Sequence, residues 1–570
     1  MTVSEHVYAA TVAGQPLSVK GGQLSLDSSR APHVECRLEV GLPGTWATGA
    51  DDGPVWTPAP ATYALLDPRT TPTPRVMVTA VKDAGVTRVF DLHVRDRSVD
   101  HRTGTVTLRL ASDEALADDY GPLVDDTTPL AFQGSLHSLV GYVLATAISG
   151  AILEAGGPDP AIRALADSQN LIRNSRAGNN ITDWGVTWNS GGVQIARYPT
   201  GGPSYAPTCV QVYANVAAST GVYVYIDDAT VRVTAGRRYL VAVSANPPAG
   251  KTITVDAILY DAAGNIVGFT PPTTIVGNGS WQRAVLDFYA IGNAARIRPR
   301  VNIGAMAYGS YFWITAWRVS EFSGDPADTD YYDGDTTDTT EYDYSWADAA
   351  HASLAVRRTL VDAPTPDALI WKAGQSAMDF LHPLVQANGL RMVCDEARVW
   401  TLRAATYAAP GSTVVRAGVN MVEGAETISR DAGIWFDARA VIYAWTDPNG
   451  VQQRRVDAYA LTDPHTRMTT LELSTAYAGP GRARYAVERA QGVGREVTVS
   501  AVSNWETTPE QPVSITLPDT PPLIGTVQSV QFDLSTDEMT VAARTVELGA
   551  HSIAALTGTI NALTGTINNL

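Results

Sequence analysis

Between about residue 170 and residue 322, the chain repeats one local pattern: a short run rich in Val, Tyr and Thr that ends at Gly, Pro or Asn. Short runs of this kind, bounded by turn residues, predict β-strands. About seven or more such strands in succession are typical of a β-sandwich or jelly roll, and about 150 residues is the size of one domain. We therefore predict a β-sandwich in the middle of the chain.

The sequence on either side of this block predicts strands with a few helices. Runs at 75–81 and 87–94 flank a turn cluster, and a third run at 105–110 alternates apolar and polar residues, which together predict an antiparallel meander. Apolar residues at helical spacing predict helices over 135–153 and 376–389, each beginning at a serine that can cap it. We expect a mainly β chain with several domains.

The acidity of the chain is concentrated in one segment. The 570 residues include 41 Lys and Arg against 58 Asp and Glu, a net charge of −17. Residues 319–356 contain no Lys or Arg but many acidic residues, so this segment carries much of the net negative charge of the chain. This balance argues against a nucleic-acid-binding protein. Within the segment, Asp333, Asp335 and Asp338 favour hydrogen-bonded turns, although a calcium site stays open.

No motif for catalysis or for a resident metal is present in the sequence. The three cysteines, Cys36, Cys209 and Cys394, lie far apart and predict small buried side chains rather than a metal site or a disulfide framework. No zinc-protease or nucleophile-elbow motif occurs. We therefore expect no enzyme activity, no catalytic residue, no metal and no cofactor, although spacing alone leaves a carboxylate pair for glycoside hydrolysis open. The first residues predict no signal peptide, and no apolar stretch is long enough for a membrane span.

Aromatic side chains in the predicted sandwich are the best candidates for ligand binding. Flat rings stack on the C–H faces of sugars, while polar groups pair with the hydroxyls. Trp184, Trp188 and Tyr205 lie near turns rich in Gly and Pro, so we predict that they are exposed and bind carbohydrate. We expect the tryptophans of later strands, Trp281, Trp313 and Trp317, to lie in the core.

The last twenty residues contain a seven-residue repeat with apolar residues at heptad spacing, from Ile553 to Leu570. Such a seam predicts a short helix that packs against copies of itself. Gly558 and Gly565 disfavour that helix by about 1 kcal/mol each, so a frayed tail stays open.

Several collinear stretches resemble minor tail proteins of siphophages that infect actinobacteria. On the two flanks these are GQLSLD at 22–27, FDLHVRDRSVDH at 90–101, GTVTLRLASDEAL at 104–116, AGQSAMDFL at 373–381, GLRMVCDE at 389–396 and the stretch 525–539. YDGDTTD at 332–338 and YDYSW at 342–346 resemble the segment that follows a carbohydrate-binding jelly roll in such proteins, with Ala347 where glycine is usual.

The resemblance implies a baseplate-hub-like protein of the phage tail tip with an inserted carbohydrate-binding module. It divides the chain into a hub-like β-rich domain at 1–166 that ends in a helix, a jelly roll at 167–324 and an acidic closing segment at 325–356. A hub-like α+β part at 357–550 and a heptad tail at 551–570, at a trimer axis, complete it. The body is then a β-barrel or α+β hub interrupted by a β-sandwich.

The resemblance also implies the partners. These are two further copies of the chain, the distal tail, tape-measure and other tail-tip proteins, and a host cell-wall polysaccharide. The protein is then a virion component made in the host cytoplasm. Two alternatives stay open: a cell-wall hydrolase with an accessory binding module, which needs a catalytic carboxylate pair, and a bacterial adhesin, which needs an export route.

Overall fold

A computed structural model describes residues 6–48, 54–82, 86–187, 192–227, 231–428, 435–447, 450–490, 495–518 and 522–545. The chain is 46% strand and 11% helix, which confirms the prediction of a mainly β fold with a few helices. The C-terminal repeat at 551–570 lies outside the described residues, so the predicted coiled coil stays a prediction. Within the described ranges, no helix is long and apolar enough to cross a membrane.

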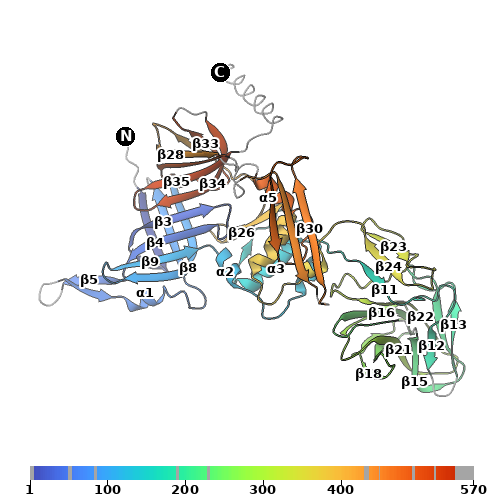
Figure 1. The fold of residues 1–570 in the computed structure, drawn as a ribbon. Helices are drawn as coiled ribbons and strands as arrows, with labels where there is room; N and C mark the ends of the chain where they lie inside the picture. The colour runs from blue at the N-terminus through green and yellow to red at the C-terminus, as the bar shows by residue number, and fades with distance from the viewer. Residues whose placement is uncertain are drawn as a thin grey trace, which may run out of the picture.

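The largest sheet combines strands from both ends of the chain (Figure 1). β3 pairs with β34 so that Leu24 lies opposite Phe532, more than 500 residues later. The strands of this sheet are β1 (His6–Val12), β2 (Gln15–Leu17), β3 (Val19–Asp27), β4 (Val34–Gly41), β7 (Arg75–Lys82), β8 (Val86–Asp100), β9 (Thr105–Ala111), β27 (Thr413–Arg416), β28 (Met421–Ile428), β32 (Arg495–Val502), β33 (Pro512–Thr516), β34 (Leu523–Asp533) and β35 (Glu538–Thr545).

The predicted meander is present in this sheet, because β7, β8 and β9 pair antiparallel in succession. Their inward residues join one core in which Trp505 stacks on Phe532 at 4.0 Å between ring centroids. A ribbon of β5 (Gly44–Thr48) and β6 (Pro54–Pro58) projects from the sheet and is followed by the short helix α1 (Pro60–Ala64).

A helical layer lies between the large sheet and the sandwich, and its core again combines both flanks of the chain. It contains η1 (Thr128–Phe132), η2 (Pro366–Leu369), α2 (Glu114–Asp119), α3 (Leu136–Ala147), α4 (Ala377–Ala387), α5 (Arg482–Ala490), β10 (Ile152–Leu153), β25 (Leu390–Cys394), β26 (Val399–Ala404), β29 (Ala438–Thr446), β30 (Gln452–Ala460) and β31 (Met468–Leu473).

The two predicted helices are capped as expected. The Ser135 and Ser376 side chains accept hydrogen bonds from backbone N–H groups three residues later, at 2.9 and 3.0 Å. The predicted extent of the first helix to residue 153 is wrong. Gly150 adopts a positive φ of 76° after the helix has ended, and Ile152 and Leu153 then pair with β26 as a short strand.

Residues 184–321 form the predicted β-sandwich of two facing sheets. One sheet contains β12 (Trp184–Thr187), β15 (Ala218–Ile226), β17 (Thr252–Tyr260), β18 (Ile266–Phe269), β19 (Thr273–Val276) and β21 (Arg296–Met306). The other sheet has the order β13 (Val193–Tyr198), β14 (Cys209–Ala214), β22 (Tyr311–Glu321), β16 (Arg238–Asn246) and β20 (Gln282–Tyr289).

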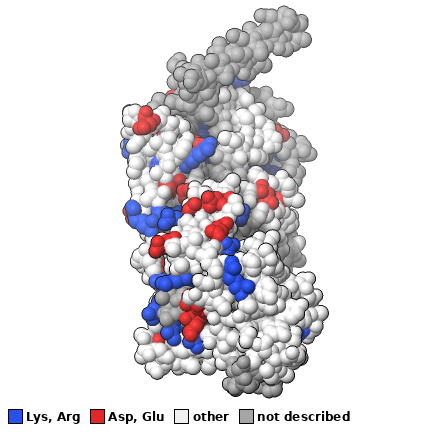
Figure 2. All heavy atoms as spheres, turned by 90° about the vertical axis from the view of Figure 1, so that its right-hand side faces the viewer, with Lys and Arg blue, Asp and Glu red and all other residues white. Residues whose placement is uncertain are grey.

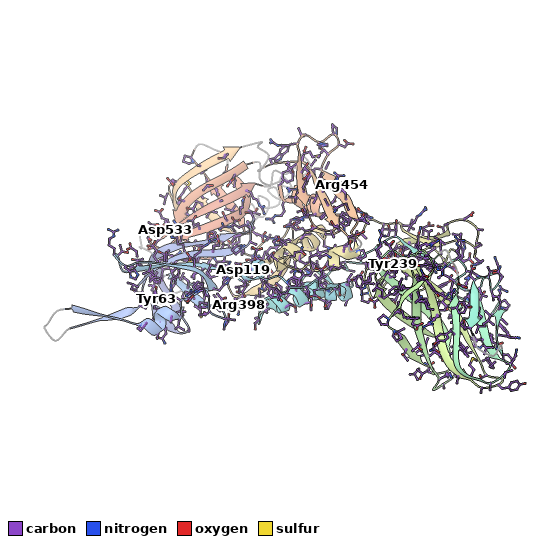
Figure 3. The ribbon with its side chains drawn as sticks, turned by 60° about the horizontal axis from the view of Figure 1, so that its bottom comes forward. Tyr63, Asp119, Tyr239, Arg398, Arg454 and Asp533 are labelled. Atoms are coloured by element: carbon purple, nitrogen blue, oxygen red, sulfur yellow. The ribbon has the colours of Figure 1, made fainter. Side chains whose placement is uncertain are left out.

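In the described residues, both connections of the sandwich to the rest of the chain lie at one end of it. β11 (Ser168–Asn170), β24 (Ala355–Thr359) and β23 (Tyr342–Trp346) form a closing ribbon there. The two connections lie side by side, because the Asp167 carboxylate accepts a hydrogen bond of 2.8 Å from the Thr359 backbone. Tyr239, labelled in Figure 3, lies at this end of the sandwich, whereas Asp119 and Arg398 lie in the central region.

A buried carboxylate links the large sheet to the helical layer. Glu114 is 2% exposed and accepts hydrogen bonds from the His33 backbone at 2.6 Å, the Ser112 hydroxyl at 2.6 Å and the Cys394 backbone at 2.9 Å. Burial raises the pKa of Glu114 from 4.5 to about 7, although these donors oppose the shift. The folded state therefore holds a proton here that the unfolded chain releases near pH 4.5.

We expect this proton to make stability depend on pH. A folded pKa above the unfolded one contributes stability that is complete below about pH 4.5 and is lost as pH rises through about 7. Between these values the free energy of unfolding should fall by about 1.4 kcal/mol per pH unit at most. Urea denaturation of the wild type and of Glu114→Gln at several pH values measures this dependence of the free energy of unfolding. The control is Glu39→Gln, which changes a half-exposed carboxylate. Parallel pH profiles for the wild type and Glu114→Gln would refute this assignment.

Candidate functional site

Trp184, predicted to be exposed, is buried. It is 7% exposed, its indole N–H donates a 2.8 Å hydrogen bond to the Asn174 carbonyl, and its ring packs edge-to-face on Trp317 at 6.4 Å. The expectation of exposure is wrong because Trp184 is the first residue of β12, not part of the turn before it. It lies opposite Ile226, on the side of the sheet that faces the core.

The other two predicted residues have different outcomes. Trp188 lies outside the described residues, so its role stays a prediction. Tyr205 is 47% exposed, and its hydroxyl lies 3.0 Å from the Ser244 hydroxyl on β16. Tyr205 belongs to the loop between β13 and β14, which folds over the outer face of the second sheet. Its part in binding is likewise a prediction.

The alternation of β14 and β22 places further aromatic residues on that outer face. In β14, Val210 and Val212 are fully buried, so Tyr213 and Gln211 point outward. In β22, Phe312 and Ile314 are buried, so Tyr311 and Trp313 point outward as well. The prediction that Trp313 and Trp281 lie in the core is therefore wrong, since both are half-buried, whereas Trp317 is fully buried as expected.

Trp313 is the centre of this group. Tyr198 meets its ring edge-to-face at 4.7 Å, and Tyr311 meets it at 6.0 Å. Gln211 on β14 and Asn246 on β16 lie directly opposite Trp313 on the neighbouring strands. The aromatic platform, as we call this surface, is formed by Gln194, Tyr198, Gln211, Tyr213, Asn246, Trp281, Tyr311 and Trp313.

The loop before β14 contacts the platform at Trp281. The Trp281 indole N–H donates a 3.1 Å hydrogen bond to the Gly201 carbonyl, which ties this loop to the start of β20. Gly202 is required there, because a Cβ atom would lie 2.0 Å from the Ala206 carbonyl oxygen. The strands thus fix most of the aromatic rings and amides of the platform, and the tight loop between β13 and β14 fixes the position of Trp281.

The aromatic platform carries no Lys, Arg, Asp or Glu among its described members, and it lies at the end of the sandwich away from the closing ribbon. Arg283 on the same face points beneath the loops instead, where it donates to the Thr329 and Ala316 carbonyls. Figure 2, seen from the side of the sandwich, shows charged side chains in patches separated by broad uncharged areas. The platform can offer stacking surfaces and neutral hydrogen bonds.

The carboxylates of the acidic closing segment have a structural role. Asp333 is 1% exposed, contacts Arg176 at 3.0 Å and accepts a 2.8 Å hydrogen bond from the Tyr331 hydroxyl. Asp335 accepts from the Trp346 indole at 3.0 Å. In the described part of the chain, no three His, Cys, Asp or Glu side chains gather as a metal site. The carboxylates of this turn hold the segment against the sandwich.

Comparison with known proteins gives only distant likenesses. No family model and no curated protein sequence matches the chain. The chain is similar to the tail protein from Neisseria meningitidis MC58, with a TM-score of 0.39 and 8% identity over 95% of this chain and 96% of that chain.

Parts of the chain are similar to two other solved structures. One is the enzymatically active domain of bacteriophage CBA120 tailspike protein 4 (TM-score 0.24, 13% identity), where the match covers 27% of this chain and 21% of that chain. The other is the C-terminal family 22 carbohydrate binding module of Clostridium thermocellum Xyn10B (TM-score 0.20, 14% identity), with 26% of this chain and 90% of that chain covered. These scores and identities are too low to assign a function.

Proposed function

We propose that the chain is a structural protein of a phage tail tip that attaches the virion to a host cell-surface glycan through its inserted sandwich. The aromatic platform is the observation that carries this proposal. Trp313 and its neighbouring tyrosines offer ring faces and edges for sugar C–H groups, and the amides of Gln211 and Asn246 can pair with hydroxyls. The rings and amides of the platform favour a polysaccharide recognised through its C–H faces and hydroxyls.

The position of the platform supports a role in attachment. Both connections of the sandwich lie at the closing ribbon, whereas Tyr311 and Asn246 lie at the opposite ends of their strands. The binding surface therefore points away from the body formed by the two flanks of the chain. Strands from both flanks of the chain build the body, and the sandwich is inserted between them. This arrangement is suited to a scaffold that presents a binding module.

We further propose a homotrimer that contacts the distal tail, tape-measure and other tail-tip proteins, as the sequence resemblance implies. Exposed apolar residues on the large sheet, among them Val7 (52% exposed) and Met77 (46%), are available for contacts between copies. Three linked platforms would bind far more tightly than one through their effective concentration. A solution mass of one chain would contradict the trimer.

We predict that Trp313→Ala weakens binding of the purified chain to host wall polysaccharide by tenfold or more. One stacked ring contributes on the order of 1 kcal/mol, and loss of Trp313 also removes the contacts that orient Tyr198 and Tyr311. Calorimetric titration against soluble wall polysaccharide measures the affinity. The matched control is Tyr289→Ala, which removes a 57% exposed ring at the other end of the same sheet.

Equal affinities for Trp313→Ala and Tyr289→Ala would contradict the platform as the binding surface. The proposed role is binding without catalysis, and it assigns no catalytic residue. Release of new reducing ends from the polysaccharide by the pure chain would favour the hydrolase alternative instead.

A further inference from the structure

A cavity separate from the aromatic platform lies where the sandwich meets the closing ribbon. Its volume is 510 Å³, within the range of small-molecule sites. It is formed by the ends of β16 and β22, by β11 and β24, and by the segment before β16. The joint cavity, as we call it, is lined by three arginines, two carboxylates and several neutral side chains.

Three arginines line the joint cavity, and two of them have no ionic partner. Neither Arg232 nor Arg358 forms an ion pair with any described carboxylate. Arg232 moreover lies directly opposite Arg296 in an antiparallel bridge, so both side chains leave the same face of the sheet. Like charges opposite each other on a sheet are destabilising, and a bound anion would relieve that repulsion.

The third arginine is buried and has a spare donor. Arg357 is 7% exposed, and its Nη1 donates a 2.6 Å hydrogen bond to the Asp328 carboxylate. Its buried Nε finds no acceptor among the described residues. Arg357 already binds an oxyanion, the Asp328 carboxylate, so a ligand anion in the cavity depends on the two arginines without an ionic partner.

The two carboxylates of the lining are already engaged by neighbours. Glu321 pairs with Arg237 at 2.5 Å, and Asp167 accepts from both the backbone and the hydroxyl of Thr359. The lining holds three arginines against these two carboxylates, so positive charge predominates in this cavity, although the whole chain carries a net charge of −17. Ser168, Gln169 and Thr234 add neutral groups of the kind that bind hydroxyls.

We propose that the joint cavity binds a sugar that carries an anionic group, a phosphate or a carboxylate. Arg232 and Arg358 hold the anion, and the neutral lining groups bind the hydroxyls. The cavity is larger than a bare oxyanion requires, which favours a ligand with a sugar ring. This site is separate from the platform, so either can fail without the other.

Calorimetric titration of the full chain at low salt tests the site with glucose 1-phosphate, glucuronate and uncharged glucose as probes. We expect saturable binding of at least one charged sugar and none of glucose. The double variant Arg232→Gln/Arg358→Gln should bind at least tenfold more weakly. Its matched control is Arg454→Gln, an exposed arginine on β30 without an ionic partner among the described residues (Figure 3). Melting curves establish that both variants are folded.

The two charged probes distinguish the source of the anion. Binding of glucose 1-phosphate alone identifies a phosphate-bearing ligand, and binding of glucuronate alone identifies a carboxylate. Higher salt should weaken either interaction. No heat with either charged sugar, binding of glucose as tight as that of the charged sugars, or an unchanged affinity in the double variant would overturn the proposal.

Discussion

Glu510→Gln should lower the free energy of unfolding of the body by about 3–5 kcal/mol, the range found when one partner of a buried ion pair is removed. Glu510 is 2% exposed and lies in the segment before β33. The Arg391 guanidinium contacts its carboxylate, and the guanidiniums of Arg403 and Arg489 lie 3.6 and 3.8 Å away. One carboxylate thus lies among three positive charges and offsets part of their mutual repulsion.

The loss of stability should be large because the three arginines and Glu510 belong to different elements that pack against one another. Arg391 lies on β25, Arg403 on β26 and Arg489 on α5, whereas the Glu510 backbone N–H is bonded to Val527 of β34 at 2.7 Å. Arg391 and Arg489 also donate to the Ser28 carbonyl at 3.1 and 3.2 Å. The neutral amide keeps the shape of the side chain but leaves the guanidiniums to repel one another at the contact between the helical layer and the large sheet.

Hydrogen exchange in urea measures this loss locally. Peptides of β34 and α5 should lose protection in Glu510→Gln, while peptides of the sandwich serve as an internal reference. The control is Glu506→Gln, an exposed carboxylate in the same segment, for which we expect little change. A loss below about 1 kcal/mol in Glu510→Gln would contradict the proposed charge balance.

Local signals in the sequence predicted local structure well. The alternation at 105–110 and the serine caps at Ser135 and Ser376 identified β9, α3 and α4, because strand periodicity and helix capping depend on neighbouring residues. The sequence could not predict the partners of Glu510, which lie 21 to 119 residues away in the chain. Such contacts depend on how separate elements pack.

The binding surface was only partly predictable for a different reason. The sequence indicated that the aromatic residues belong to the sandwich, but not which side of each strand faces the core. A shift of one residue in the start of a strand moves every side chain to the opposite face. The turn before Trp184 suggested exposure, although the strand begins at that residue. Once β14 and β22 are placed, the outward positions of Tyr213 and Tyr311 follow from strand alternation, because their neighbours Val212 and Phe312 face the core.

Trp184→Ala should therefore destabilise the sandwich by about 3–5 kcal/mol, as expected when a large buried aromatic side chain is removed. The substitution leaves a cavity beside Trp317 and removes the donor that satisfies the Asn174 carbonyl. Thermal melting and hydrogen exchange of β12 and β15 peptides measure the loss. Trp184→Phe keeps most of the packing and should cost much less.

The exposed Tyr205 provides the comparison that decides between a core and a surface role. Tyr205→Ala removes a ring that is 47% exposed and should change the melting temperature little, because the core beneath it stays filled. Any effect of Tyr205→Ala should instead fall on glycan affinity. If Trp184→Ala left the sandwich as stable as Tyr205→Ala and abolished glycan binding, Trp184 would belong to the binding surface, against its burial beside Trp317.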